Sequence, residues 1–298
     1  MEELKTCPLC GNENFTHFLS ARDHFLSRES FTIVQCHNCN LKFTNPRPDE
    51  SVMPRYYESE EYISHDTRQK SLLHSLYRFA RNIAVRNKYN IIRKYSNGFS
   101  LLDIGCGTGE VLNYCSKKNF QTTGIEPSEK ARNFAATHYG LQIFDESHLD
   151  HLPDHSFDVI TMWHVLEHVH NLNARLKKIH DLLIPGGALI VAVPDCDSWD
   201  AKKYGDYWAA YDLPRHLYHF SQETINILMA KNDFRVQKII PMKMDAFYIS
   251  LLSHKYLSGR QNYFQAFFYG IRSNKHAIKN NRDYSSLIYI CKIAQEVK

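Results

Sequence analysis

The stretch LLDIGCGTG, residues 101–109, decides the fold of this chain. Its apolar start predicts a strand, its three glycines predict a tight turn, and EVLNYCSKK, residues 110–118, predicts a helix. A strand, a glycine turn and a helix in this order bring bare backbone amides close to a bound ligand. A dinucleotide fingerprint has the spacing G-x-G-x-x-G, whereas Gly109 follows Gly107 by only two positions. The loop therefore does not favour NAD.

Short apolar runs alternate with amphipathic stretches after Gly98. The runs LLDIG, TTGIE, LQIF, FDVITMW, GALIVAVP and VQKII predict strands, and this alternation indicates βαβ units and a parallel sheet. Two carboxylates stand at strand ends, because Asp103 precedes the first glycine and Glu126 ends TTGIE, 23 positions later. An acid at the second position can accept hydrogen bonds from both hydroxyls of a ribose.

These motifs, in this order, resemble those of the class I S-adenosylmethionine-dependent methyltransferase family. Its first motif matches DIGCGTG (103–109), its second matches Glu126, and LIPGG (183–187) resembles the turn before its fifth strand. The resemblance covers residues 97–240 and implies an α/β fold with a doubly wound, mostly parallel, seven-stranded Rossmann-like sheet. It implies that the glycine loop holds the methionine end of the cofactor and Glu126 the ribose, while His148 stands where the family often has an acid for the adenine. The expected cofactor-binding residues are Asp103, Gly105, Cys106, Gly107, Gly109, Glu126, Pro127, His148, Leu149 and Trp163.

The composition is that of a globular protein. Of 298 residues, 43% are hydrophobic and 23% charged, which excludes disorder as the main state. The net charge of +4 is too small to indicate a nucleic-acid partner by itself, although residues 68–94 hold eight Lys or Arg and no carboxylate. No apolar run reaches the roughly 20 residues of a membrane span, and MEELKTCPLC (1–10) lacks signal-peptide features. We therefore expect a cytoplasmic protein with no membrane span.

Two C-x-x-C pairs near the start predict a metal site. CPLC (7–10) and CHNC (36–39) are each followed by a residue that tolerates a left-handed turn. Four thiolates so paired suit tetrahedral zinc, whereas a redox role fits a single pair better. A module this short cannot build its own core, so metal binding is expected to supply its folding energy. We expect a zinc-ribbon-like module with structural Zn²⁺ on Cys7, Cys10, Cys36 and Cys39, and His37 as a weaker alternative ligand.

The chain divides into four parts. Residues 1–48 form the zinc-binding module, and residues 49–96 a helical linker and cofactor-covering segment, in which helical spacing from Ser71 to Tyr95 predicts one long amphipathic helix or two. YYESEEYISH (56–65) resembles a segment that closes over the cofactor in such relatives. Residues 97–240 form the methyltransferase domain with an aromatic, histidine-rich substrate lid at 195–220, and 241–298 a C-terminal extension that completes the sheet and the substrate site.

The candidate catalytic residues stand at the strand ends and in the lid. Methyl transfer from a sulfonium needs an aligned attacking atom and, for a hydroxyl, removal of its proton. His164 follows the strand FDVITMW (157–163), where it can act as a general base or serve as a packing or cofactor contact, with Glu167 and His168 on the same helix face. The lid offers further groups: His216, His219 and Asp212 for proton transfer, Trp208 and Tyr211 to cover the substrate, and Arg215 to clamp an anion. The alternative is that the aromatic residues of the lid simply pack on the domain.

The whole chain resembles bacterial small-molecule methyltransferases that carry an N-terminal zinc module. The sequence MWH (162–164) lacks both the Pro-Pro-Tyr motif and the Pro-Cys nucleophile of enzymes that methylate DNA bases. The expected function is methylation of a small-molecule acceptor, most readily an oxygen of a sugar or secondary metabolite, with anionic acceptors included and nucleic acid not expected. The alternatives are an RNA methyltransferase that uses the zinc module and the basic helix, and a non-catalytic binding protein with the same fold. The acceptor and the oligomeric state stay open.

Overall fold

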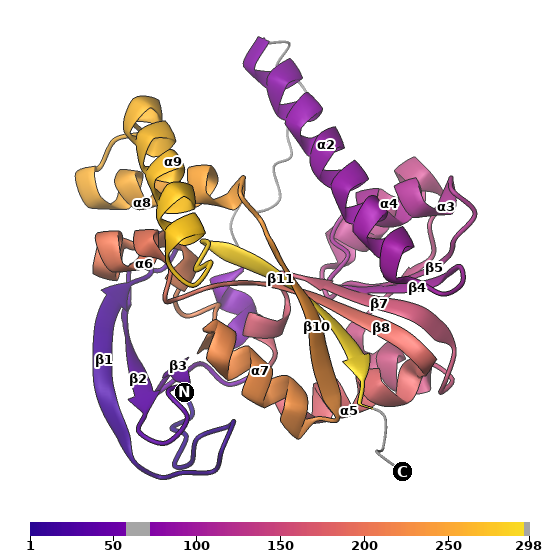
Figure 1. The fold of residues 1–298 in the computed structure, drawn as a ribbon, viewed down its shortest axis with the longest axis horizontal. Coiled ribbons are helices and arrows are strands. Elements are labelled where there is room, and N and C mark those ends of the chain that lie inside the picture. The colour runs from indigo at the N-terminus through magenta and orange to yellow at the C-terminus, as the bar shows by residue number, and fades with distance from the viewer. Residues whose placement is uncertain (58–71, 295–298) are drawn as a thin grey trace.

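A seven-stranded sheet forms the centre of the protein (Figure 1). The computed structural model describes residues 1–57 and 72–294. The strand order is β10-β11-β8-β7-β4-β5-β6, in which β8 to β6 are parallel and β11 is antiparallel to both of its neighbours. The predicted mostly parallel, seven-stranded sheet is therefore confirmed. Its strands are β4 (Ser100–Ile104), β5 (Gln121–Ile125), β6 (Ile143–Phe144), β7 (Phe157–Trp163), β8 (Leu183–Pro194), β10 (Phe234–Pro241) and β11 (Ser286–Ile293).

Helices cover both faces of this sheet, with α2, α3 and α4 above it and α5 and α7 below it in Figure 1. The central strand β8 accordingly reads as one apolar run, and the stretch 188–193 is almost wholly buried. Helix α5 buries Leu172, Leu176 and Ile179, a spacing that places all three on one side. The helices are α2 (Leu72–Tyr95), α3 (Glu110–Ser116), α4 (Glu129–Tyr139), α5 (Leu172–Leu182) and α7 (Gln222–Lys231).

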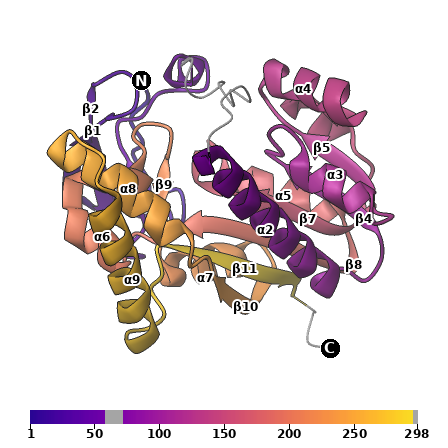
Figure 2. The ribbon, with the colours of Figure 1, turned by 90° about the horizontal axis from the view of Figure 1, so that it is seen from above.

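The remaining elements gather at one end of the sheet (Figure 2). Strand β8 ends at Pro194 and β10 ends at Pro241, and both of these residues pair with the start of β11. The segments that follow these two ends therefore meet at the same edge, which is also the carboxyl edge of β4 and β7. They are α6 (Trp199–Tyr204), the short strand β9 (Tyr218–His219), α8 (Asp245–Ser258) and α9 (Tyr263–Lys279).

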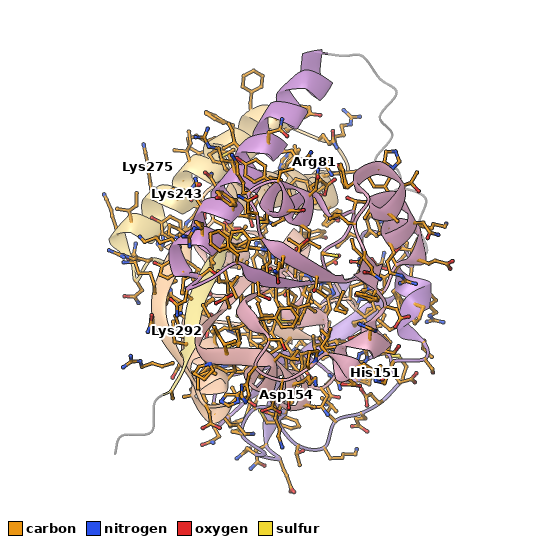
Figure 3. All side chains as sticks on the ribbon, turned by 90° about the vertical axis from the view of Figure 1, so that its right-hand side faces the viewer. Arg81, His151, Asp154, Lys243, Lys275 and Lys292 are labelled. Carbon is orange, nitrogen blue, oxygen red and sulfur yellow. The ribbon has the colours of Figure 1, made fainter. Side chains whose placement is uncertain are left out.

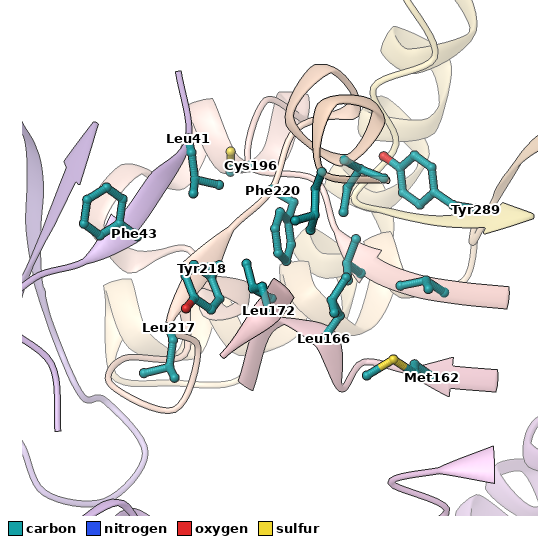
Figure 4. Packing of buried hydrophobic residues seen from close by; sticks show 14 of the residues in the cluster. Leu41, Phe43, Met162, Leu166, Leu172, Cys196, Leu217, Tyr218, Phe220 and Tyr289 are labelled. Carbon is teal, nitrogen blue, oxygen red and sulfur yellow. The ribbon is translucent and has the colours of Figure 1, made fainter. Parts of the chain in front are cut away.

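The N-terminal cysteine segment folds as a small sheet of β1 (Phe15–Arg22), β2 (Ser30–Cys36) and β3 (Lys42–Thr44). Its fourth strand is β9, which comes from the predicted lid and pairs Tyr218 with Phe43. Phe43, Tyr218 and Leu166 belong to one buried cluster that runs on into the main sheet (Figure 4). Residues 1–48 thus share their core with the lid and the large sheet, because a three-stranded sheet alone cannot bury its apolar face.

The predicted basic helix is one helix, α2. Arg81, labelled on α2 in Figure 3, pairs with Glu110 at the start of α3, and Arg93 lies over the ring of Phe99. The expectation for residues 58–65, and the basic residues Arg68 and Lys70, lie outside the described part of the chain. Among the described residues, no helix combines the length and the apolar character that crossing a membrane requires.

Candidate active site

The glycine loop between β4 and α3 leaves its backbone open to a ligand. Gly105, Gly107 and Gly109 have φ values of 70°, 55° and 80°, in the left-handed region that favours glycine. A Cβ added at Gly107 would meet no atom within 4 Å, whereas one at Gly109 would lie 2.9 Å from Leu141. Gly109 is therefore required by the packing below the loop, and Gly107 provides free space above it.

The two predicted carboxylates lie on either side of this loop. Asp103 is buried and accepts a 2.5 Å hydrogen bond from the hydroxyl of Thr161. Burial raises the pKa of Asp103 to about 6, although the bond from Thr161 opposes the shift. Glu126 accepts backbone N–H groups of Gly107 and Ser128, both at 2.9 Å. Because a carboxylate has about four acceptor positions, Glu126 can still receive two ribose hydroxyls.

The residues expected around the adenine lie farther along the same edge. His148 stacks on Phe144, with ring centroids 3.8 Å apart and an interplanar angle of 10°. Leu149 is buried, and the carbonyl of Pro127 accepts a 2.7 Å hydrogen bond from Arg132. Sequence reasoning did not include Phe144, although it ends a predicted strand just as Glu126 does. The flat pair of Phe144 and His148 suits stacking against a base.

Lys88 of α2 is a site residue that sequence reasoning missed. Its ammonium lies 4.7 Å from the centre of the Trp163 ring, and it faces Asp103 and Asp245. Burial lowers the pKa of Lys88, although both carboxylates oppose the shift. The indole N–H of Trp163 is buried without a hydrogen-bond acceptor in the described structure, so it is available to a ligand. The sequence did indicate that Lys88 points toward the domain. It precedes the apolar residues Ile91 and Ile92 by three and four positions and so shares their helix face.

His164 is held between two carboxylates directly after β7. Its Nδ1 lies 3.4 Å from Glu167 and its Nε2 lies 3.2 Å from Asp245. Burial alone would lower the pKa of His164, but the two carboxylates raise it to about 9. The φ of His164 is 57°, which is unusual for a residue with a side chain. The raised pKa favours the protonated ring, which donates hydrogen bonds, and so weakens the case for His164 as the expected general base.

The lid residues that were expected to contact the acceptor are mostly structural. The indole of Trp208 donates a 2.9 Å hydrogen bond to Asp200, and Tyr211 packs edge-on against Trp208. Arg215 is almost wholly buried between Asp23, at 2.9 Å, and Asp212, at 2.7 Å. Asp212 is thereby an ion-pair partner. The expectation that Arg215 clamps an anionic acceptor is wrong for this structure, because its guanidinium binds carboxylates of the chain itself.

The histidines of the lid have different surroundings. His219 is buried in β9, where its Nε2 lies 3.3 Å from the hydroxyl of Thr44, and burial lowers its pKa well below the usual value. His216 lies beside the residues that follow β7, with its Nε2 4.0 Å from the carboxylates of both Glu167 and Asp212. His216 is thus close to His164 through Glu167, whereas His219 belongs to the contact with the N-terminal sheet.

The four paired cysteines come together at one end of the small sheet. Cys7 and Cys39 have sulfur atoms 3.5 Å apart, as do Cys10 and Cys36, and all four sulfurs lie within 4.8 Å of one another. All four are free thiols. A zinc ion with Zn–S distances of about 2.3 Å needs tetrahedral sulfurs about 3.8 Å apart. The donor set therefore fits zinc.

Comparisons with known proteins agree with this geometry. A family model described as "Methyltransferase domain" matches residues 65–239. The ubiquinone biosynthesis O-methyltransferase of Caulobacter vibrioides is 34% identical over 125 residues, which are 40% of this chain and 47% of that protein. The protein of the same name from an Azoarcus species is 34% identical over 100 residues, 31% of this chain and 42% of that protein. The matches thus span less than half the length of these relatives.

Solved structures show the same fold at low identity. A SAM-dependent methyltransferase from Archaeoglobus fulgidus is 19% identical, with a TM-score of 0.51 and coverage of 71% of this chain and 94% of that chain. A magnesium protoporphyrin IX methyltransferase from Synechocystis with bound SAH is 16% identical, with a TM-score of 0.52 and coverage of 83% and 100%. Since the family model spans more than half of the 298 residues, the chain belongs to the methyltransferase domain family.

Proposed function

We propose that this protein is an S-adenosylmethionine-dependent methyltransferase that methylates an oxygen atom of a small molecule. The observation that carries the proposal is the glycine loop, where the open backbone at Gly107 lies beside the carboxylate of Glu126. Membership in the methyltransferase domain family supports the same activity. The curated relatives carry the name of an O-methyltransferase, which favours oxygen over nitrogen or carbon.

The residues at the carboxyl edge fit the parts of this cofactor. Glu126 has acceptor positions for the ribose hydroxyls, and Phe144 with His148 offers a flat surface to the adenine. The ionised carboxylate of Asp103 has the charge to attract the amino group at the methionine end. When bound, the cofactor supplies a methyl group on a positively charged sulfur. The chain's own task is to hold an acceptor oxygen in line with that methyl group and to exclude water.

The acceptor side is formed by His164, Glu167 and His216, which follow β7 or lie in the lid beside it. His164, whose pKa is raised to about 9 by its two carboxylates, can donate a hydrogen bond to an acceptor hydroxyl. His216 lies on the same side, with its Nε2 4.0 Å from Glu167. Since Arg215 already pairs with Asp23 and Asp212, it gives no support for an anionic acceptor. We therefore favour a neutral hydroxyl compound.

We further propose that Cys7, Cys10, Cys36 and Cys39 bind a structural zinc ion. The ion would fix the ends of β1–β3 and so secure the strand pairing with β9. The effect of the zinc ion on the reaction would be indirect, because it would act on the lid through this strand pairing. Chelation should accordingly lower the stability of the N-terminal sheet before it affects cofactor binding.

The RNA methyltransferase alternative has less support. Of the cations on α2, Arg81 pairs with Glu110, Arg93 covers Phe99, and Lys88 faces the site. These three side chains are engaged within the chain, and of the other described cations on α2 only Arg86 and Lys94 are exposed, which weakens the argument for a phosphate-binding helix. A non-catalytic role would not explain why Glu167 and Asp245 lie on either side of His164.

Two measurements test the proposed function. Calorimetry should detect binding of S-adenosylhomocysteine to the purified full chain. Mass spectrometry should then detect a gain of one methyl group when the protein and S-adenosylmethionine are mixed with a panel of phenols, sugars and other hydroxyl compounds. Absence of S-adenosylhomocysteine binding would overturn the proposal, and a methylated RNA with no methylated small molecule would replace it with the alternative.

A further inference from the structure

Outside the cysteine cluster, a second group of metal-ligating side chains lies at the acceptor side. Glu167, His168 and His216 each offer one ligand atom, and these atoms lie within 4.8 Å of one another. Glu167 and His168 belong to the short turn after β7, whereas His216 comes from the lid. Two imidazoles and one carboxylate are a donor set typical of first-row divalent transition metals.

Hydrogen bonds to backbone carbonyls fix the orientation of both rings. Nδ1 of His216 donates to the carbonyl of Ala210 at 2.8 Å, and Nδ1 of His168 lies 3.0 Å from the carbonyl of Arg215 and 2.8 Å from the hydroxyl oxygen of Tyr57. A carbonyl oxygen can only accept and a tyrosine hydroxyl oxygen can also accept, so a proton on Nδ1 satisfies these contacts in each ring. With Nδ1 as the donor, Nε2 of each ring offers its lone pair to a ligand. This is the arrangement that usually supports a metal-binding histidine.

The carboxylate of Glu167 is the least satisfied group in this cluster. Its side chain is 1% exposed, and neither oxygen accepts a hydrogen bond within the described part of the chain. The nearest cation is His164, at 3.4 Å, and His216 lies 4.0 Å away. A buried carboxylate without hydrogen bonds is costly, and a bound cation would offset that cost.

Two neighbours of the cluster are partly exposed. His164 is 33% exposed and Asp212 is 29% exposed, whereas Glu167 and His216 are buried. Asp212 lies 4.0 Å from His216 but is held by Arg215, which keeps it out of the ligand set. A metal ion bound by the other three residues would therefore have its fourth ligand position free for the acceptor.

We propose that Glu167, Nε2 of His168 and Nε2 of His216 bind a divalent transition-metal ion that receives the hydroxyl of the acceptor. The acceptor part of this inference depends on the proposed methyltransferase function. The ion would lower the pKa of the hydroxyl, whose proton leaves to solvent. The oxygen then forms its bond to the methyl carbon as the carbon–sulfur bond breaks, and the sulfur keeps the electron pair.

Cobalt titration of the full chain, with the cysteine site already filled by zinc, tests the proposal. Co²⁺ on nitrogen and oxygen ligands absorbs in the visible region without the strong sulfur-to-metal absorption that thiolates add. We expect one such Co²⁺ per chain. His168→Ala, at a half-buried position, and Glu167→Gln should each weaken this binding at least about tenfold. The exposed His151→Ala variant is the matched control and should bind Co²⁺ as the wild type does.

Two results would overturn the metal site: no saturable Co²⁺ absorption outside the thiolates, or unchanged Co²⁺ affinity in both His168→Ala and Glu167→Gln. Calorimetry with S-adenosylhomocysteine on the same samples separates this failure from that of the proposed function. Loss of Co²⁺ binding with intact S-adenosylhomocysteine binding removes only the metal site. Co²⁺ binding without any S-adenosylhomocysteine binding would leave the metal site and remove the role in methyl transfer.

Discussion

The backbone N–H of Gly107 donates a 2.9 Å hydrogen bond to Oε2 of Glu126. This bond joins two motifs of the cofactor site that are 19 positions apart in the sequence, the glycine loop after β4 and the acid after β5. It orients the carboxylate so that its remaining acceptor positions are free for a ligand. The position of Glu126 is thus fixed before any cofactor arrives.

Replacement of this acid should weaken cofactor binding. We expect Glu126→Ala to reduce affinity for S-adenosylhomocysteine by about 1 to 3 kcal/mol, or roughly 5- to 150-fold, because the ribose hydroxyls lose their acceptor. Isothermal titration calorimetry measures the change. Glu129→Ala, at an exposed position of α4, is the control and should leave the affinity unchanged. Equal affinities of Glu126→Ala and the wild type would remove Glu126 from the ribose site.

Asp103 should make stability depend on pH. Its folded-state pKa of about 6 lies above the usual 3.8, so its contribution to stability is present at low pH and is lost as the pH rises through 6. Asp103→Asn keeps an acceptor for Thr161 but does not titrate. Relative to the wild type, this variant should therefore gain about 1 kcal/mol between pH 5 and pH 7.5. Urea unfolding of both proteins at the two pH values measures this, and a constant difference would contradict it.

Loss of one cysteine ligand should remove zinc. Cys10→Ser is expected to bring the zinc content of the purified protein from one ion per chain at the cysteines to none, and to lower the midpoint of thermal unfolding. Elemental analysis and circular dichroism provide the two readouts. His37→Ala changes an exposed neighbour of the cysteines and should keep the zinc. Zinc retained by Cys10→Ser together with zinc lost by His37→Ala would reverse the ligand assignment.

Arg215 should matter for stability. Arg215→Met leaves the buried Asp23 and the partly exposed Asp212 without their cation, and we expect a loss of about 3 to 5 kcal/mol in the free energy of unfolding. Chemical denaturation measures the loss. Arg86→Met, at an exposed position of α2, should cost almost nothing. If Arg215→Met unfolded like the wild type but bound its acceptor more weakly, the anion-clamp role would be restored.

Local sequence carried enough information for the fold and for the position of the cofactor loop. Alternating apolar runs predicted the strands, and LLDIGCGTG predicted the turn, because both depend on neighbours in the chain. The pairing of β3 with β9 could not be predicted in this way. It joins Phe43 to Tyr218, 175 positions apart, and the three-residue strand β3 carries too little pattern to signal a partner.

The candidate site was predicted unevenly for the same reason. Glu126 and the glycines follow from spacing along the chain. The roles of Arg215 and His164 depend instead on carboxylates that are distant in sequence, Asp23 and Asp245. In the sequence, an arginine in a polar loop suggests a ligand contact whether or not a distant carboxylate of the same chain pairs with it in the folded structure. Only the tertiary structure decides between the two roles.

The strand that the lid contributes to the cysteine-bearing sheet has a consequence for engineering. A shortened protein that starts after Pro48 would expose the edge of β9 and uncover Tyr218 and Phe220, which are buried in the intact chain. Such a fragment is expected to aggregate instead of serving as a minimal enzyme. For the same reason, replacing the lid with one from another protein to alter acceptor choice would require replacing residues 1–48 as well, since β3 and β9 have to pair.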